Sequence, residues 1–387
     1  MLPRRLLHAL PLTLSFGCSA AAPPPAVPSA TPAEGALPPP MATDPASGHV
    51  CTEIIGLSDV ALTFDGGKTL VQSRRPRSGV KLVYVVSLGA PYTLAALVTP
   101  LDGPNPELFI STDGGCHWTS RGHKEALHVA AGHDGIAYAW AHELLAVSAG
   151  AVRQLGPPPG TIDDLAVDVA DSRHIRFAGP DGVFDSTDGA ASWRKVGDIA
   201  SPSNTPAFAF APADLNHVLY SRERFPEAVQ MEPPPIQLSR DGGRSWARST
   251  GNGRAGELCL SAGGSTAWSF GPTFYRSVDG GASFAKVATP IPSLAGDVAR
   301  VGAQDDPNVL VLAGYETPIK GTWSTFLLRF DLHSFEWKRQ LLPLDAGRFN
   351  DGYTTTSESV RGATFVPGET SAICLGITRS PGIEPLR

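Results

Sequence analysis

The octapeptide SRDGGRSW spans residues 239–246 and decides the fold, because it recurs along the chain with little change. Its pattern is S/T-x-D-G-G/A-x-S/T-aromatic. The other copies are STDGGCHW at 111–118, STDGAASW at 186–193, SVDGGASF at 277–284 and TFDGGKTL at 63–70, the last of which lacks only the aromatic residue. Such self-similarity predicts a chain built from stacked structural repeats.

Each part of the octapeptide has a physical use. The Asp-Gly-Gly core needs positive φ angles, which glycine adopts at little cost, so it closes a β-hairpin. The carboxylate can accept hydrogen bonds from nearby backbone N–H groups and lock the turn. The aromatic residue begins the next strand and can pack between units. We expect turn-locking by Asp65, Asp113, Asp188, Asp241 and Asp279, and packing by Trp118, Trp193, Trp246 and Phe284.

The pattern resembles the Asp box, also called the bacterial neuraminidase repeat, and the resemblance covers roughly residues 50 to 380. It implies an all-β fold, a β-propeller of four-stranded blades. The interval between Asp113 and Asp188 is too long for one unit of about 40–50 residues. A degenerate copy is expected at 145–152, and a second one from Phe326 to Trp337. Five clear copies and two degenerate copies predict seven blades.

The end of the chain is expected to close the ring. The first copy lies so early in the folded part that its blade lacks inner strands. Residues 362–366 and 371–377 can supply them, so the N- and C-terminal strands would share one blade. That arrangement replaces open strand edges with paired ones.

The first 18 residues are predicted to be a signal peptide. Arg4 and Arg5 precede an apolar run from Leu6 to Phe16, which is too short for a permanent membrane span. Cys18 follows Gly17 and resembles the lipidated cysteine of bacterial lipoproteins. Ordinary cleavage near 20–22 is the alternative. Either route exports the chain, to the bacterial cell envelope or as a secreted protein, with the membrane contacted only through a lipid anchor.

Residues 19–48 are predicted to be a Pro/Ala-rich linker. Nine of the 23 residues from Pro23 to Pro45 are proline, and such a segment favours an extended spacer over a packed core. The folded domain is therefore expected at 49–387.

The charge and the histidine spacing of the chain argue against nucleic acid, metal and cofactor binding. The formal net charge is -6 with 18% charged residues, and no basic stripe is present, so nucleic acid is not an expected partner. One region is rich in possible metal ligands, which are His123, His128, His133 and His142 with Asp134 and Glu143. The spacing of these histidines matches no compact ligand pattern, so we predict no metal and no cofactor.

Asp-box propellers include sialidases and other glycoside hydrolases, sortilin-type receptors and an assembly factor of photosystem II, so the fold does not choose a function. A sialidase resemblance would assign catalysis to Arg75, Tyr353 and Glu358, with Arg361 nearby. The family's Arg-Ile-Pro motif is reduced here to Arg75-Pro76. We therefore favour a non-enzymatic binding or assembly module, with a protein or glycan ligand at the top face or central opening. A secreted sialidase-like glycoside hydrolase is the alternative.

Four cysteines remain beside Cys18: Cys51, Cys116, Cys259 and Cys374. Export permits disulfides, and four cysteines allow three pairings. We expect Cys51–Cys374 as a clamp on the shared blade, with Cys51–Cys116 as the competing pairing.

Overall fold

The structure is a computed structural model, in which every regular element described is a β-strand. All described residues belong to the compact unit Thr43–Arg387. No helix among them could cross a membrane. The predicted signal peptide, the linker, Cys18 and Cys51 lie outside them. The described residues are 60–63, 70–74, 76–77, 80–90, 92–100, 105–123, 126–130, 134–141, 143–199, 206–222, 235–251, 257–270, 273–288, 294–302, 309–316, 324–331, 334, 336–342, 349–350, 353–354, 358–365 and 373–379.

The described strands form six sheets of four strands, one of five and one of two. We number the larger sheets along the chain. Sheet 1 contains β1 (Val60–Thr63), β2 (Val71–Gln72), β30 (Glu358–Phe365) and β31 (Ile373–Arg379). Sheet 2 contains β3 (Val80–Ser87), β4 (Leu94–Pro100), β5 (Glu107–Ser111) and β6 (Thr119–His123). Sheet 3 contains β7 (Ala126–Ala130), β8 (Ile136–Ala141), β9 (Leu144–Ser148) and β10 (Val152–Gln154).

Sheet 4 contains β11 (Asp164–Val167), β12 (Ile175–Gly179), β13 (Gly182–Ser186) and β14 (Arg194–Gly197). Sheet 5 contains β15 (Ala207–Ala211), β16 (Asp214–Ser221), β17 (Gln237–Ser239) and β18 (Ala247–Arg248). Sheet 6 contains β19 (Thr250–Gly251), β20 (Glu257–Leu260), β21 (Ala267–Phe270), β22 (Phe274–Ser277) and β23 (Ser283–Val287). Sheet 7 contains β24 (Leu294–Gly302), β25 (Val309–Glu316), β26 (Ser324–Asp331) and β27 (Glu336–Leu341).

The two ends of the folded part share sheet 1, whose strand order is β2-β1-β31-β30. Strand β1 pairs antiparallel with β31, so that Ala61 lies opposite Leu375 and Thr63 lies opposite Ile373. Strands β30 and β31 therefore supply the inner strands that the first unit lacks, as predicted. This closure removes the free edges that the first and last strands would otherwise present.

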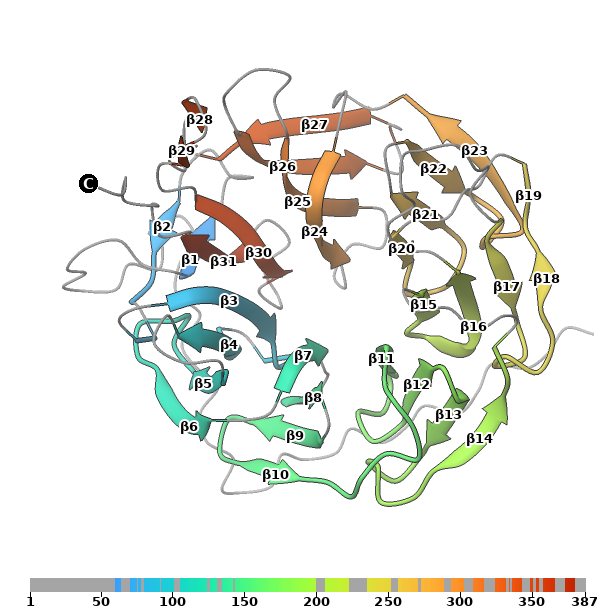
Figure 1. The fold of residues 1–387 in the computed structure, drawn as a ribbon, viewed down its shortest axis with the longest axis horizontal. Coiled ribbons are helices and arrows are strands. Elements are labelled where there is room, and N and C mark those ends of the chain that lie inside the picture. The colour runs from blue at the N-terminus through green and yellow to red at the C-terminus, as the bar shows by residue number, and fades with distance from the viewer. Residues whose placement is uncertain are drawn as a thin grey trace, which may run out of the picture. The chain divides into compact units, whose positions relative to one another are not determined.

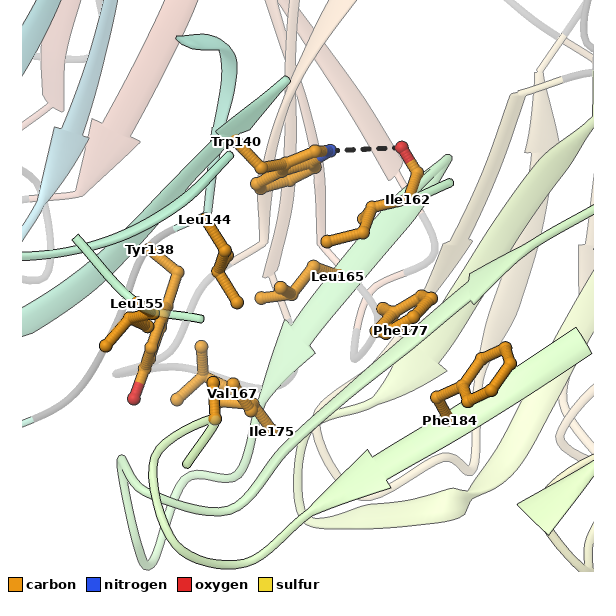
Figure 2. Close-up of a cluster of buried hydrophobic side chains, with 11 residues drawn as sticks. Tyr138, Trp140, Leu144, Leu155, Ile162, Leu165, Val167, Ile175, Phe177 and Phe184 are labelled. Carbon is orange, nitrogen blue, oxygen red and sulfur yellow. Dashed lines mark hydrogen bonds between the residues drawn. The ribbon is translucent and has the colours of Figure 1, made fainter. Parts of the chain in front are cut away.

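The described apolar side chains of sheets 1 to 6 pack against the following sheet. Between sheets 3 and 4, Tyr138 and Trp140 pack with Leu165 and Phe177 in one buried cluster (Figure 2). The last sheet reaches the first, because β24 lies against β30. Figure 1 shows one edge strand of each sheet near the centre and the other edge strand outside. The inner strands are β30, β3, β7, β11, β15, β20 and β24. The prediction of an all-β chain of four-stranded antiparallel sheets, arranged as in a β-propeller, is confirmed.

The octapeptides occupy one equivalent position, the connection between the third and fourth strands of a sheet. Asp113 lies between β5 and β6, Asp188 between β13 and β14, and Asp241 between β17 and β18. The two expected degenerate copies fall at the same place, between β9 and β10 and between β26 and β27. One departure is sheet 6, where β19 arrives from the preceding unit and pairs parallel with β23.

Candidate functional site

The octapeptide at 239–246 forms a closed hydrogen-bond network around Asp241. The Ser239 hydroxyl donates to Asp241 Oδ1 at 2.8 Å and accepts from the Gly243 N–H at 2.7 Å. The Ser245 N–H donates to Asp241 Oδ1 at 2.9 Å, and its hydroxyl donates to Oδ2 at 2.6 Å. Both carboxylate oxygens are therefore used by the turn itself.

The other described copies repeat this network. Ser283 donates to both carboxylate oxygens of Asp279, and Ser192 does the same for Asp188. Hydrogen bonds from Ser192 lower the pKa of Asp188 to about 2. Burial raises the pKa of Asp279, but hydrogen bonds from Ser277 and Ser283 outweigh it, so the pKa is about 2. Such carboxylates stay ionised and engaged, which suits a structural role better than acid–base chemistry.

His117 takes the place of the second serine beside Asp113. Its Nδ1 lies 2.6 Å from Asp113 Oδ2, and its N–H donates to Oδ1 at 2.9 Å. Asp65 lies outside the described residues, so its turn stays a prediction.

The Asp-box turns also join neighbouring sheets. The Arg74 N–H, just after sheet 1, donates to the Gly115 carbonyl of the box in sheet 2 at 2.9 Å. The Asp198 N–H, after sheet 4, donates to the Gly243 carbonyl of the box in sheet 5 at 3.1 Å. Each of these boxes thus holds its own hairpin and the outer end of the sheet before it.

The aromatic residues reinforce this contact. Trp118 Nε1 donates to the Arg74 carbonyl at 2.9 Å, and Trp246 Nε1 donates to the Asp198 carbonyl at 2.6 Å. Phe284 is buried in the cluster between sheets 5 and 6. The eight residues of a box thus close a hairpin, bond the backbone of the preceding sheet and place an aromatic side chain at the junction of the two sheets. The chain folds into sheets arranged as in a β-propeller, and its outer turns carry the Asp-box pattern.

The densest cluster of titratable side chains in the described part of the propeller surrounds Asp185 on β13. Arg176 donates to Asp185 Oδ1 from Nε at 2.9 Å, with Nη2 at 2.7 Å. His174 places Nε2 3.1 Å from Asp185 Oδ1 and Nδ1 2.9 Å from Asp168 Oδ2. Both Arg176 and Asp185 are buried, at 4% and 5% exposure.

Electrostatics stabilise the ionised form of Asp185. Burial alone raises its pKa, but the charge and hydrogen bonds of Arg176, with a contribution from His174, hold the pKa below its ordinary value. Arg176 extends to sheet 5, where Nη1 donates to the Leu215 carbonyl at 2.5 Å and to Asn216 Oδ1 at 3.0 Å. The cluster therefore clamps sheet 4 to sheet 5, and its donors and acceptors face one another rather than a ligand.

Similar polar links recur at other junctions. The Tyr138 hydroxyl on β8 donates to the Ser172 carbonyl of the next sheet at 2.8 Å. His217 on β16 is buried, and its Nε2 donates to the Gly280 carbonyl of the next sheet at 2.7 Å. Burial lowers the pKa of His217. These links cannot be predicted from the sequence, because no local pattern marks them.

Inner strands face the centre of the propeller, where the sequence analysis expected a ligand. His128 on β7 is exposed and stacks on Trp140 at 5.4 Å between ring centroids. Trp140 is held by its Nε1, which donates to the Ile162 carbonyl at 3.2 Å (Figure 2). Among the described residues, no group of three or more His, Cys, Asp or Glu side chains could hold a metal ion. His133 and His142 lie outside them.

The sialidase-like assignment of Arg75, Tyr353 and Glu358 stays a prediction, because the structure does not describe these side chains. Arg75 lies outside the described residues. Tyr353 is the first residue of β29 (Tyr353–Thr354), which pairs only in the two-stranded sheet with β28 (Phe349–Asn350). Glu358 begins the inner strand β30. The side chains of Tyr353 and Glu358 lie outside the described set.

The cysteines give one firm result, that Cys116 is disulfide-bonded. Cys259 keeps its thiol. The partner of Cys116 is therefore among Cys18, Cys51 and Cys374. A bonded Cys116 favours the pairing Cys51–Cys116 over the pairing Cys51–Cys374. Both pairings stay predictions.

Comparisons with known proteins give one sequence relative and several distant structures. No family model matches the chain. The dispase autolysis-inducing protein of Streptomyces mobaraensis is 33% identical over 157 residues, which are 39% of this chain and 40% of that protein. The match thus spans less than half the length of the relative.

Solved structures resemble parts of the chain at low sequence identity. YCF48 from Cyanidioschyzon merolae is 12% identical with a TM-score of 0.47, covering 78% of this chain and 97% of that one. The GH74 enzyme of Niastella koreensis is 13% identical with a TM-score of 0.45, covering 85% and 54%.

We predict that Asp241→Ala lowers the free energy of unfolding by about 1–2 kcal/mol, because the Ser245 and turn N–H groups lose their acceptor. Hydrogen bonds from Ser245 lower the pKa of Asp241 to about 2, well below the unfolded value of about 3.9. A carboxyl group with a depressed folded pKa stabilises the fold above its unfolded pKa and loses that effect as pH falls towards 2. Urea unfolding at neutral pH and near pH 2.5 measures both effects.

The matched control is Glu336→Ala, which removes an exposed acid outside any intact box. The Asp241 variant should also lose less stability on acidification than the wild type. Equal stability of Asp241→Ala and wild type at neutral pH contradicts a turn-locking carboxylate.

Proposed function

We propose that this Asp-box propeller is an exported binding module that acts on another protein, and specifically on a secreted protease. The observation that carries the proposal is the 33% identity over 157 residues to a protein named for inducing the autolysis of dispase. That name describes an effect exerted on a protease. The box carboxylates support a non-enzymatic role, since their oxygens are consumed in turns.

We propose seven blades, one for each sheet of four or five strands, with sheet 1 as the shared blade. The ligand surface would be the face or central opening formed by inner strands, where His128 is exposed beside Trp140. A lipid on Cys18 and the linker would hold this surface away from the membrane.

The test incubates purified dispase with the mature chain. We expect faster loss of intact dispase and of its proteolytic activity, in proportion to the amount of propeller added. The heat-unfolded chain is the control for nonspecific effects. Unchanged dispase stability, together with no complex in size-exclusion chromatography, contradicts the proposal.

Lipidation gives a separate prediction. Cys18 should incorporate a labelled fatty acid when the full chain is expressed in a bacterium, because it follows the apolar run and Gly17 directly. Cys18→Ala should abolish the label and release the protein from the membrane fraction. Equal labelling of the two proteins rules out this anchor.

The alternative, a sialidase-like hydrolase, predicts turnover of a fluorogenic sialoside, whereas we expect none. A glycosidase needs two placed carboxyl groups, or a tyrosine with an activating carboxylate, and a sialidase needs cations aimed at the substrate carboxylate. Turnover that disappears in Tyr353→Phe would establish the alternative. Turnover that survives this substitution would indicate a different pair of acids.

A further inference from the structure

The outermost strands of the propeller carry a charge opposite to that of the whole chain. The chain has 31 Lys and Arg residues against 37 Asp and Glu residues. On the outer strands β2, β6, β10, β14, β18, β19, β23 and β27, the only described acid is Glu336. The cations on the same strands, here called the basic rim, are Arg121, Arg153, Arg194, Lys195, Arg248, Lys286, Lys338 and Arg339.

The segregation follows from the architecture. Except for Glu336, the described acids lie on the inner three strands of the sheets, in loops, or in turns and boxes, where Asp closes turns. The outer strands face solvent at the perimeter (Figure 1). Every cation of the basic rim except Arg121 is exposed. Positive charge is therefore displayed around the side of the propeller, at right angles to the central opening.

Two of these cations are partly neutralised by neighbours. Lys195 Nζ lies 2.5 Å from Asp198 Oδ1, and Arg194 lies 3.4 Å from Asp185 Oδ2. The cations best placed to bind an external anion are Arg153 on β10, Arg248 on β18, Lys286 on β23 and Lys338 on β27, each from a different sheet.

We propose that the basic rim binds a linear anionic polysaccharide. A flat membrane can touch only a short arc of a curved edge, whereas a flexible polymer can follow cations spread over successive blades. A protein partner needs an apolar or aromatic anchor at the centre of its interface. Leu341 is the one large hydrophobic residue exposed on the described outer strands. The rim offers charge with little apolar surface, which suits a hydrated polyanion.

This site is distinct from the proposed protease-binding surface, so the two can fail separately. It also differs from edge protection, in which Lys and Arg on outer strands only discourage strand pairing between molecules. In that case removing the cations causes association of the protein and leaves polymer binding unaffected.

The test is retention of the mature chain on immobilised polygalacturonate at low salt, with neutral dextran as the control matrix. Retention should decrease as salt is added, since exposed charges are screened within about 10 Å at 0.1 M. The rim variant Arg153→Gln with Arg248→Gln should weaken binding about fivefold, because two exposed charges lose their attraction for the polymer. The variant Lys286→Gln with Lys338→Gln should do the same.

The matched control is Arg173→Gln with Arg222→Gln, which removes two exposed arginines outside the outer strands. It should keep wild-type affinity within about twofold, because neither arginine lies on the strands that the polymer is proposed to follow. Absence of retention, equal weakening in the control, or rim variants that aggregate while still binding would each overturn the proposal. Tighter binding of polyglutamate than of polygalacturonate would also overturn it, in favour of an acidic protein.

Discussion

Gly281→Ala is expected to lower the free energy of unfolding by about 2–4 kcal/mol, from left-handed strain and overpacking together. Gly281 has a φ of +94°, and a Cβ at this position would overlap Cδ2 of Leu219 and lie 3.3 Å from Cδ1. Leu219 is fully buried in the cluster between sheets 5 and 6, so it has no room to move away. Urea unfolding followed by tryptophan fluorescence measures the loss.

The equivalent position in sheet 4 provides a matched comparison. Ala190 has a φ of +67° where the other described boxes have glycine, so Ala190→Gly should relieve strain and stabilise the chain by up to about 1 kcal/mol. Gly263→Ala, with no atom within 4 Å of the added Cβ, should be nearly neutral. If Gly281→Ala lowers the free energy of unfolding no more than Gly263→Ala does, the box does not clamp the neighbouring sheet.

Local patterns made most of the fold predictable. The octapeptide places the hydroxyl, carboxylate and glycine of one turn within a few residues, so sequence spacing is enough to predict a hairpin. The degenerate copy at 145–152 was found in the same way, and its Ser148 still receives the Ala151 N–H at 3.2 Å. The closure of the ring was predictable because the first unit has too few strands for a sheet, and the C-terminal segments can supply the missing ones.

Contacts between sheets were not predictable from spacing. Arg176 and Asn216 are 40 positions apart, and neither lies in the repeated pattern. The parallel pairing of Thr250 with Ser283 depends on where the chain leaves sheet 5, which strand periodicity does not determine. The ligand surface has the same difficulty, because its side chains would come from inner strands that are far apart in the sequence.

Arg176 provides the second large expected effect, because it neutralises a buried carboxylate across a sheet junction. Arg176→Met keeps much of the side-chain volume but leaves Asp185 buried with a weaker counter-charge, at a cost of about 3–5 kcal/mol. It also removes the hydrogen bonds to Leu215 and Asn216 in sheet 5. Thermal and urea unfolding should therefore show a large loss of stability.

A double-mutant cycle separates the ion pair from general packing. Asp185→Leu alone leaves the Arg176 charge buried, whereas Arg176→Met with Asp185→Leu removes both charges. We expect the double variant to be less destabilised than the sum of the two single variants by at least about 1 kcal/mol, because neither charge is then left unpaired. Additive losses would mean that Arg176 stabilises the junction through its bonds to sheet 5 alone. In that event the low pKa of Asp185 would come from His174 and Arg194, and His174→Gln with Arg194→Gln should raise that pKa.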